Sequence, residues 1–431
     1  MVLCWLGSTN TNTNIRINME TEPERVDKAA QRVVRTARVY LSKGSRVRVL
    51  LLVFLAALAL LGSAYILRSS LLWGANVQPK SRTSSTTTTT SSRRRGNEEV
   101  KEILTSSADE VRILGGGGPS VRAAYATRRG HYADDPGWRN QDSLALLPDF
   151  GGSAGGEAFS RGRGVLMGVF DGHGSSGEGC SRVASSEFPS SLSRRLAAGE
   201  AAEGAMAAAF LDANAALRRS DVDDSISGTT AVVALLTGAE LWVGNVGDSR
   251  AVAGVLSGDG SSGHNYGVKA IDLTSDQTPF REDEKIRLRK SGARVQTFDQ
   301  VSGLKDPTSD SWAEREEDEY DPPRVWPPHS NQMGLAMSRS IGDNLMSQYG
   351  VTAQAEVEVR KLDESMAVVI VATDGVWEFM SSQKAVDIAL RHKDAREAAR
   401  AIASRSFKRW MGNDVRSDDI TVLVAFLDWG S

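Results

Sequence analysis

Residues 165–174 read Val-Leu-Met-Gly-Val-Phe-Asp-Gly-His-Gly, an apolar run that ends at a charged turn. The six residues of the run are rich in β-branched and large apolar side chains and are bounded by turn residues, which indicates a β-strand. Asp171 stands at the point where this strand ends. A carboxylate in that position is fixed by the rigid sheet beneath it and points into the space beyond the sheet.

Four other aspartates occupy the same kind of position, directly after a strand-like run or just before one begins. They are Asp142, Asp248, Asp374 and Asp418. Carboxylates that converge at strand ends repel one another unless a cation neutralises them. Hard oxygen ligands of this kind select hard divalent ions such as Mg²⁺ or Mn²⁺. The sequence therefore predicts a metal-dependent hydrolase.

Further strand-like runs recur in the part of the chain that follows residue 121. Together with the first they lie at residues 165–170, 230–236, 241–246, 251–255, 367–372 and 420–427. Helical periodicity is present at residues 177–198, 203–217, 281–291, 382–391 and 394–406. Because a tight turn alone separates the second run from the third, we expect antiparallel sheets with helices outside them, not a series of β-α-β units.

Charge divides the 431-residue chain into two unequal parts. Residues 1–120 carry 17 Lys and Arg against 9 Asp and Glu, whereas the remainder carries 34 against 45. An acidic C-terminal part is not typical of nucleic-acid binding, so no nucleic-acid partner is expected. The two cysteines, Cys4 and Cys180, cannot form a disulfide framework or a cysteine-rich zinc site.

Residues 49–67 form the one long uncharged stretch of the chain. As a helix these residues would rise about 28 Å, close to the ~30 Å hydrocarbon core of a bilayer. The stretch has no polar face, unlike most core helices, and a signal peptide does not usually follow so long a charged leader. We therefore predict a single transmembrane helix and a membrane localisation.

This stretch divides the chain into a basic N-terminal tail (1–48), a transmembrane helix (49–67), a Ser/Thr/Gly-rich linker (68–120) and a globular catalytic domain (121–431). Lys and Arg are more frequent before the span than after it, which favours a cytosolic N-terminus. The chain lacks the glycosylation sites and disulfide potential common in a secretory lumen, so the side of the catalytic domain stays open. The linker residues 100–114 could form a helix or pair with the domain.

A glycine pattern offers a competing interpretation of the first strand and its turn. Residues 172–177 match the Gly-x-Gly-x-x-Gly pattern of dinucleotide-binding loops. No second strand with a ribose-binding acid follows, and the charge of Asp171 would repel a pyrophosphate. Dinucleotide binding is therefore an alternative that a titration with NAD(H) tests.

Six motifs occur in a fixed order along the chain. They are Phe-Asp-Gly-His-Gly (170–174), Ser-Gly-Thr-Thr (227–230), Asn-Val-Gly-Asp-Ser-Arg-Ala-Val (245–252), Gly-Leu-Ala-Met-Ser-Arg-Ser-Ile-Gly-Asp (334–343), Ala-Thr-Asp-Gly-Val-Trp (372–377) and Ser-Asp-Asp-Ile-Thr-Val (417–422). On these motifs, residues 128–427 resemble the PPM (type 2C) family of metal-dependent protein serine/threonine phosphatases, with a plant-like segment at Arg324-Val325-Trp326. The resemblance implies an α+β fold, a four-layer α/β/β/α sandwich of two antiparallel sheets flanked by helix pairs.

The same resemblance implies a centre of two Mg²⁺ or Mn²⁺ ions at one edge of the sandwich. Asp171 would bridge both ions and the carbonyl of Gly172 would complete the first. Asp374 and Asp418 would hold the second ion. Asp142 falls on the acidic position that the family has before its first strand.

The resemblance also suggests roles for residues at positions where this chain matches the family pattern less fully. Asp248 matches a residue that helps to bind a weaker third ion, and His173 is the best general acid among the five histidines. Gln141 stands where many members have Glu. Relatives often carry a phosphate-binding arginine five positions before Asp142, where this chain has glycine, so Arg139 is the nearest substitute. The family's substrate-facing flap corresponds to residues 296–330, which include an acidic run at 314–319.

Two cations about 3.5–4 Å apart lower the pKa of a water between them, so that hydroxide can attack phosphorus. We therefore predict a membrane-anchored phosphatase that hydrolyses phosphoserine and phosphothreonine in protein substrates and has a monomeric catalytic domain. The alternative is a catalytically weak pseudophosphatase that acts as a membrane-tethered binding module. Gln141 and the missing arginine favour that alternative.

Overall fold

The computed structural model describes residues 104–106, 110–113, 118–151, 164–257, 267–310, 312 and 321–429. The predicted N-terminal tail and transmembrane helix lie outside these residues, as do most of the predicted linker and the acidic run of the flap. Within the described ranges no helix has the length and apolar character needed to cross a membrane.

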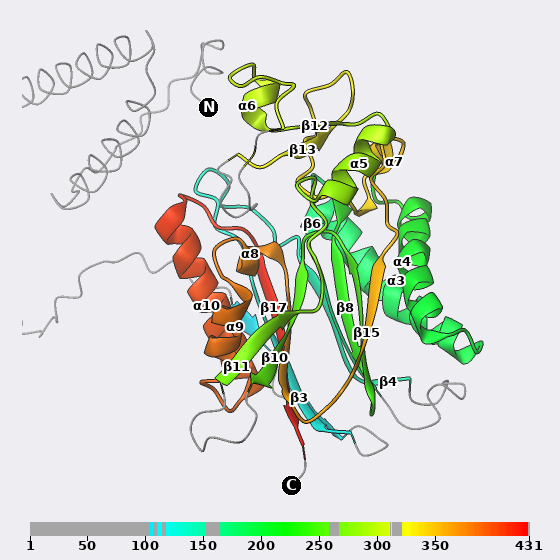
Figure 1. Cartoon of the computed structure of the whole chain (residues 1–431), viewed down its shortest axis with the longest axis vertical. Helices are drawn as coiled ribbons and strands as arrows, with labels where there is room; N and C mark the ends of the chain where they lie inside the picture. Colours follow the sequence, from blue (N-terminus) through cyan, green and yellow to red (C-terminus); the bar gives the residue numbers. More distant parts are fainter. Residues whose placement is uncertain are drawn as a thin grey trace, which may run out of the picture. The chain divides into compact units, whose positions relative to one another are not determined.

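Two antiparallel sheets form the centre of the fold (Figure 1). The larger sheet has the order β1-β3-β17-β16-β10-β11, and β2 also pairs with β3. Its strands are β1 (Leu104–Ser106), β2 (Glu110–Ile113), β3 (Ser120–Arg128), β10 (Arg250–Ser257), β11 (Gly267–Asp272), β16 (Met366–Ala372) and β17 (Ile420–Asp428). Because β1 and β2 both pair with β3, part of the segment that the sequence left open joins the sheet of the catalytic domain.

The smaller sheet has the order β15-β9-β8-β5-β4. Its strands are β4 (Ser143–Phe150), β5 (Gly164–Phe170), β8 (Ala231–Leu236), β9 (Glu240–Val246) and β15 (Glu356–Lys361). Helices α3 (Gly177–Ala197) and α4 (Ala202–Arg219) pack on this sheet, and α9 (Ser382–Ala389) and α10 (Ala395–Asn413) pack on the larger one (Figure 1). The predicted four-layer sandwich is thus confirmed.

Successive apolar side chains of a strand point to opposite faces of its sheet, which explains why the two sheets stack and why helices cover their outer faces. In β17, Leu423 and Ala425 belong to the apolar cluster between the sheets, whereas Val422 and Val424 belong to the cluster beneath α9 and α10. The strands of the smaller sheet alternate in the same way, with a third cluster beneath α3 and α4. Both faces of each sheet are therefore buried, and every buried Val or Leu side chain contributes about 1.5–3 kcal/mol relative to exposure.

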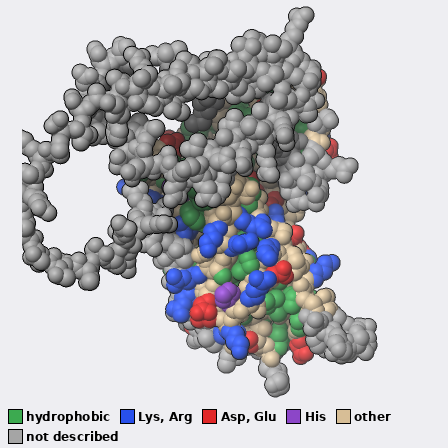
Figure 2. All heavy atoms as spheres, turned by 90° about the vertical axis from the view of Figure 1, so that its left-hand side faces the viewer, with side chains coloured by type: hydrophobic (Ala, Val, Ile, Leu, Met, Phe, Trp, Pro, Cys, Tyr) green, Lys and Arg blue, Asp and Glu red, His purple; other side chains and the backbone are tan. Residues whose placement is uncertain are grey.

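Helix α10 is longer than its apolar periodicity predicted, and it ends at Asn413 instead of residue 406. Trp410 holds the additional turns of the helix in place. Its Nε1–H donates to the carbonyl of Gly375 at 2.8 Å, and its ring packs edge-on against Phe379. The outer side of this helix is basic, with exposed Arg400 and Lys408. Figure 2 shows Lys and Arg side chains gathered on the face that carries α10.

Short elements connect the sheets at the end where the aspartates lie. Strands β6 (Gly172–His173), β7 (Gly228–Thr229) and β14 (Ile341–Gly342) form a small sheet, and α7 (Asn344–Ser347) and α8 (Asp374–Trp377) follow β14 and β16. Residues 293–310, 312 and 321–335, which we call the flap, contain β12 (Arg294–Gln296), α6 (Phe298–Val301) and β13 (Arg324–Trp326) and follow α5 (Glu282–Lys290). A small apolar cluster around Val295 and Val325 joins the flap to Leu288 of α5 and Met346 of α7.

Candidate active site

The five predicted aspartates lie at strand ends of both sheets. Asp171 joins β5 to β6, Asp142 precedes β4, and Asp248 lies between β9 and β10. Asp374 is the first residue of α8, directly after β16, and Asp418 precedes β17. Two sheets that are stacked face to face thus contribute to one acidic group, which we call the acidic centre.

The charges of the acidic centre act on one another. Burial is the main reason why the pKa of Asp171 lies well above its usual range, and the charges of the other four aspartates raise it further. Burial also raises the pKa of Asp374, and the charges of Asp418 and Asp248 raise it further. Because each ionised carboxylate disfavours ionisation of its neighbours, the acidic centre carries more negative charge than its surroundings accommodate.

Several buried oxygens of the acidic centre receive no hydrogen bond from the part of the chain that the structure describes. The buried Oδ1 atoms of Asp142, Asp248 and Asp374 have no hydrogen-bond partner among the described residues. Leaving a buried acceptor without a partner costs about 1–3 kcal/mol. A divalent cation relieves both this cost and the mutual repulsion, and carboxylate oxygens are the donors that Mg²⁺ and Mn²⁺ prefer. The residues present therefore fit the metal that the sequence predicts.

The number of ions remains a prediction. Within the described part of the chain no three of these aspartates have ligand oxygens that all lie within 4.8 Å of one another. An ion bound by several of them would draw the side chains together or complete its shell with water, which Mg²⁺ commonly retains.

Close backbone contacts explain the glycines that follow two of the aspartates. A Cβ atom at Gly172 would lie 2.3 Å from the carbonyl oxygen of Gly177 and 2.5 Å from that of Gln141. A Cβ atom at Gly375 would lie 1.9 Å from the carbonyl oxygen of Asp419. Only glycine lets these segments approach so closely, and this approach brings Asp171 and Asp374 beside the other strand ends.

Asp419, to which the sequence gave no role, fixes the loop that carries Asp142. Its carboxylate accepts the N–H groups of Gly130 at 2.5 Å and Gln141 at 2.8 Å. Burial raises the pKa of Asp419 to about 6 although these hydrogen bonds oppose the rise. The side-chain amide of Gln141 donates to the carbonyl of Gly174 at 2.8 Å, so this residue joins two loops of the site.

His173 forms a buried pair with a residue that sequence reasoning quoted only as the end of a motif. Its Nε2 lies 2.6 Å from Oδ2 of Asp343, whose side chain is 1 % exposed. Burial alone would lower the pKa of His173, but the charge and hydrogen bond of Asp343, together with the charge of Asp248, outweigh it and raise the pKa. The Nδ1 atom is buried and has no partner among the described residues.

Asp343 reaches His173 through an unusual backbone conformation. Its φ angle is 48° and that of the preceding Gly342 is 98°, both in the left-handed region. A non-glycine residue in that region is uncommon and often marks a functional position. The Gly-Asp pair that ends the fourth motif was the signal available in the sequence.

The contacts of Arg139 do not include the acidic centre. Its side chain is 81 % exposed, and its Nη1 is 3.7 Å from Oε2 of Glu178 in the first turn of α3. In the described ranges no hydrogen bond or ion pair joins Arg139 to any of the five aspartates. An exposed ion pair of this kind contributes little, about 0–1 kcal/mol.

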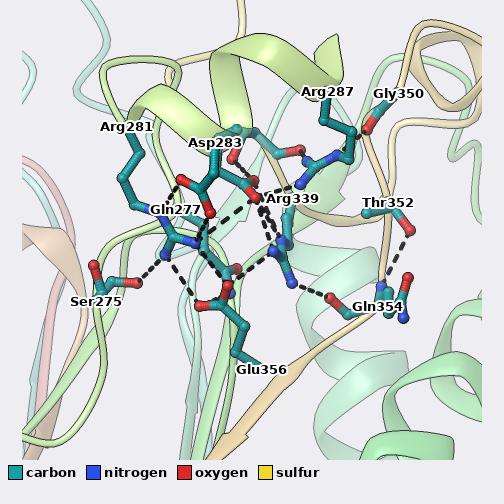
Figure 3. A network of polar contacts seen from close by, with 12 residues as sticks. Ser275, Gln277, Arg281, Asp283, Arg287, Arg339, Gly350, Thr352, Gln354 and Glu356 are labelled. Carbon is teal, nitrogen blue, oxygen red and sulfur yellow. Dashed lines mark hydrogen bonds and ion pairs between the residues drawn. The ribbon is translucent and has the colours of Figure 1, made fainter. Parts of the chain in front are cut away.

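A second acidic group lies elsewhere, and arginines already neutralise it. Asp283, Glu284 and Glu356 are the one described set of acidic side chains with ligand oxygens all within 4.8 Å of one another. Arg281 and Arg339 both bind Glu356, at 2.7 Å and 2.9 Å (Figure 3). A separate paired network of this kind joins α5 to β15 and has no need of a cation.

The topology around β5 argues against the dinucleotide alternative. The glycine-rich residues 172–177 do lead from this strand into α3, but β5 pairs antiparallel with both of its neighbours, β4 and β8. A dinucleotide-binding loop lies between a strand and a helix of a parallel β-α-β unit. That unit is absent at this loop.

Comparison with known proteins agrees with this geometry. A family model described as "Protein phosphatase 2C" matches residues 139–415, which is more than half of the chain. The chain belongs to the protein phosphatase 2C family. It is accordingly a protein serine/threonine phosphatase, and the resemblance based on the six motifs is confirmed. Metal dependence is general in this family.

Plant proteins are among the most similar relatives. The chain is 40 % identical over 308 residues to "Probable protein phosphatase 2C 35" of Arabidopsis thaliana, which covers 71 % of this chain and 84 % of the relative. It is 32 % identical over 326 residues to "Probable protein phosphatase 2C 64" of Oryza sativa subsp. japonica, with coverage of 74 % and 68 %.

The solved structure of serine-threonine phosphatase 2C from Toxoplasma gondii superimposes with a TM-score of 0.56 at 20 % identity. The match covers 75 % of this chain and 99 % of that one. At this level of identity the likeness shows the fold alone.

Proposed function

We propose that this phosphatase removes phosphate from phosphoserine and phosphothreonine side chains of proteins at the acidic centre. The observation that supports the proposal is the close grouping of five aspartates, in which the charges of the other four raise the pKa of Asp171 and three members retain buried oxygens without partners among the described residues. In this proposal Asp171, Asp374, Asp418 and the carbonyl of Gly172 would hold two Mg²⁺ or Mn²⁺ ions.

Asp142 and Asp248 complete the proposed metal centre, the latter at a weaker third position. When bound, the ions would supply a water acidic enough to serve as the nucleophile near neutral pH and would offset charge on the phosphoryl oxygens. The chain's own residues keep these aspartates in place, since Asp419 and the glycines at 172 and 375 fix the loops that carry them.

His173 is the proposed general acid. As the bond between phosphorus and the serine or threonine oxygen breaks, that oxygen needs a proton. Asp343 occupies Nε2 of the imidazole at 2.6 Å and favours the protonated ring, which leaves the proton on Nδ1 for the departing oxygen. Asp343 thus positions His173 and favours its protonated form.

Release of phosphate from a phosphopeptide tests the proposal. We expect turnover that needs Mn²⁺ or Mg²⁺, stops when a chelator removes the ion, and is lost in Asp171→Asn. If folded wild-type protein with metal bound gives no turnover, the pseudophosphatase alternative is favoured.

We further propose that residues 49–67 anchor the enzyme in a membrane, and that the linker beginning at residue 68 ends before β1, because β1 and β2 belong to the sheet of the catalytic domain. The support is the length and uncharged character of that stretch. Extraction of the full chain from membranes by alkaline buffer without detergent would contradict the anchor. Protease protection in sealed vesicles would then identify the side on which the catalytic domain lies.

A further inference from the structure

Arg324 is a partly buried cation of the flap whose donors are poorly satisfied. A guanidinium has five N–H donors. One nitrogen, Nη1, donates to the carbonyl of Gly334 at 3.3 Å, and the buried Nε has no partner among the described residues. Arg324 forms no ion pair with any described residue. An arginine that is both desolvated and short of acceptors is expected to have a ligand that supplies them.

The flap holds this guanidinium in place. Strand β13 pairs with β12, so that Arg324 lies opposite Gln296. The guanidinium lies over the ring of Phe298, 4.8 Å from its centroid, and that ring packs edge-on against Trp326 at 5.2 Å. Trp326 in turn donates from Nε1 to the carbonyl of Gln296 at 2.8 Å. The side chain is thus pre-positioned by packing instead of by an acidic partner.

The acidic centre lies close enough for its charges to act on Arg324. Burial lowers the pKa of Arg324 and the charge of Arg416 lowers it further, whereas the charges of Asp321, Asp248 and Glu378 oppose this effect. In the opposite direction, Arg324 lowers the pKa of Glu378, which burial and the charge of Asp418 raise. Glu378 directly follows α8, the helix that begins with Asp374. The turn before β10 and the end of α8 thus both lie near enough for their charges to act on the guanidinium.

We propose that Arg324 binds the phosphoryl group of the substrate, the task for which the sequence offered Arg139. This inference rests on the proposed phosphatase function. A phosphoryl group brings two negative charges to a site that is already acidic, and a planar guanidinium can bind two of its oxygens at once. Arg139 is largely exposed and lies beside Glu178, so it is less suited to the task.

Three variants of the full chain separate phosphate binding from a general effect on the flap. They are Arg324→Gln, Arg324→Lys and the control Arg294→Gln. Arg294 lies on the paired strand, and its donors bind the flap carbonyls of Pro327 at 3.0 Å and Ser330 at 2.7 Å. The control therefore loosens the flap without touching the proposed phosphate contact.

The measurements are kcat and KM for a phosphopeptide and for p-nitrophenyl phosphate, and the inhibition constant of inorganic phosphate. In Arg324→Gln we expect both KM values and the phosphate inhibition constant to rise about 10- to 100-fold. Arg324→Lys should recover part of the loss, because lysine keeps the charge but not the planar fork. In Arg294→Gln the phosphate inhibition constant should change less than about threefold.

An unchanged phosphate inhibition constant in Arg324→Gln, or an equal rise in Arg294→Gln, overturns the inference. Inactive wild-type protein is a separate result that rejects the proposed function. In that case calorimetric titration of metal-loaded wild type and Arg324→Gln with inorganic phosphate still tests Arg324. Equal phosphate affinity in the two proteins would overturn the inference there as well.

Discussion

Replacing Glu284 by glutamine should destabilise the protein by about 3 kcal/mol at pH 7. The Glu284 side chain is 1 % exposed and lies where α5 meets the segment that contains Ser338 and Arg339. It accepts hydrogen bonds from Arg339 at 2.8 Å, from Arg287 and from the hydroxyl of Ser338. Glutamine keeps the shape of the side chain but removes the charge and places an N–H₂ group against these donors.

Two routes give the magnitude. Burial would raise the pKa of Glu284, but the hydrogen bonds from the two arginines and Ser338 outweigh it and lower the pKa from 4.5 to about 2. At about 1.4 kcal/mol for each pKa unit, this difference corresponds to about 3 kcal/mol. Removing one partner of a buried ion pair costs about 3–5 kcal/mol in other proteins, which agrees.

Urea unfolding of wild type and Glu284→Gln measures the loss, and Asp283→Asn is the matched control. Asp283 is the preceding residue and also pairs with an arginine, but its side chain is 64 % exposed. Removing the charge of Asp283 should lower the free energy of unfolding by less than about 1 kcal/mol.

The pH dependence of the Glu284→Gln effect provides a second check. Because the folded pKa of Glu284 is depressed, its contribution is complete above the unfolded value of about 4.5 and is lost as the pH falls toward 2. The stability difference between wild type and variant should therefore shrink below pH 4.5. A difference below about 1 kcal/mol at pH 7, or one that does not depend on pH, would refute the reasoning.

Three further predictions concern the site and the core. Asp171→Asn should lose activity by several orders of magnitude while its melting temperature without metal rises, since a buried like charge is removed; near-normal turnover would contradict the assigned role. Asp343→Asn should lower kcat about 10- to 100-fold and, because the Asp343 charge raises the pKa of His173, should move the alkaline limb of the kcat pH profile to lower pH; an unchanged limb would remove the link to His173. Burial raises the pKa of the Cys180 thiol to about 12, so peptide mapping should find it unmodified by iodoacetamide until the protein unfolds, and modification of folded protein would contradict this burial.

Much of the fold could be predicted because short sequence patterns carry it. The runs at 165–170 and 420–427 are almost uninterrupted apolar segments, and they are strands β5 and β17. The tight turn after residue 236 indicated antiparallel pairing, which β8 and β9 confirm. The end of α10 was mispredicted because the contact of Trp410 with Gly375 joins segments distant in sequence.

The candidate site was predicted in part for the same reason. Each aspartate of the acidic centre has a local signal, namely a turn at the end of an apolar run. Asp419 and Asp343 have weak local signals, since their roles depend on partners that are distant in the chain. Arg139 was favoured by proximity in sequence to Asp142, and sequence proximity does not decide where an exposed side chain points.

The sequence by itself determined six strands (β5, β8, β9, β10, β16 and β17), the family, and the positions of carboxylates at strand ends, because these depend on local composition and ordered motifs. It did not predict β3, β4, β11 and β15 of the same two sheets. The tertiary structure alone decided which polar groups meet: Asp343 at His173, Glu284 among its arginines, and Arg324 beside the acidic centre. These contacts between residues distant in sequence depend on how the two sheets stack and on how the flap packs against them. Burial and the charges of neighbours, which set each pKa, exist only after that packing has formed.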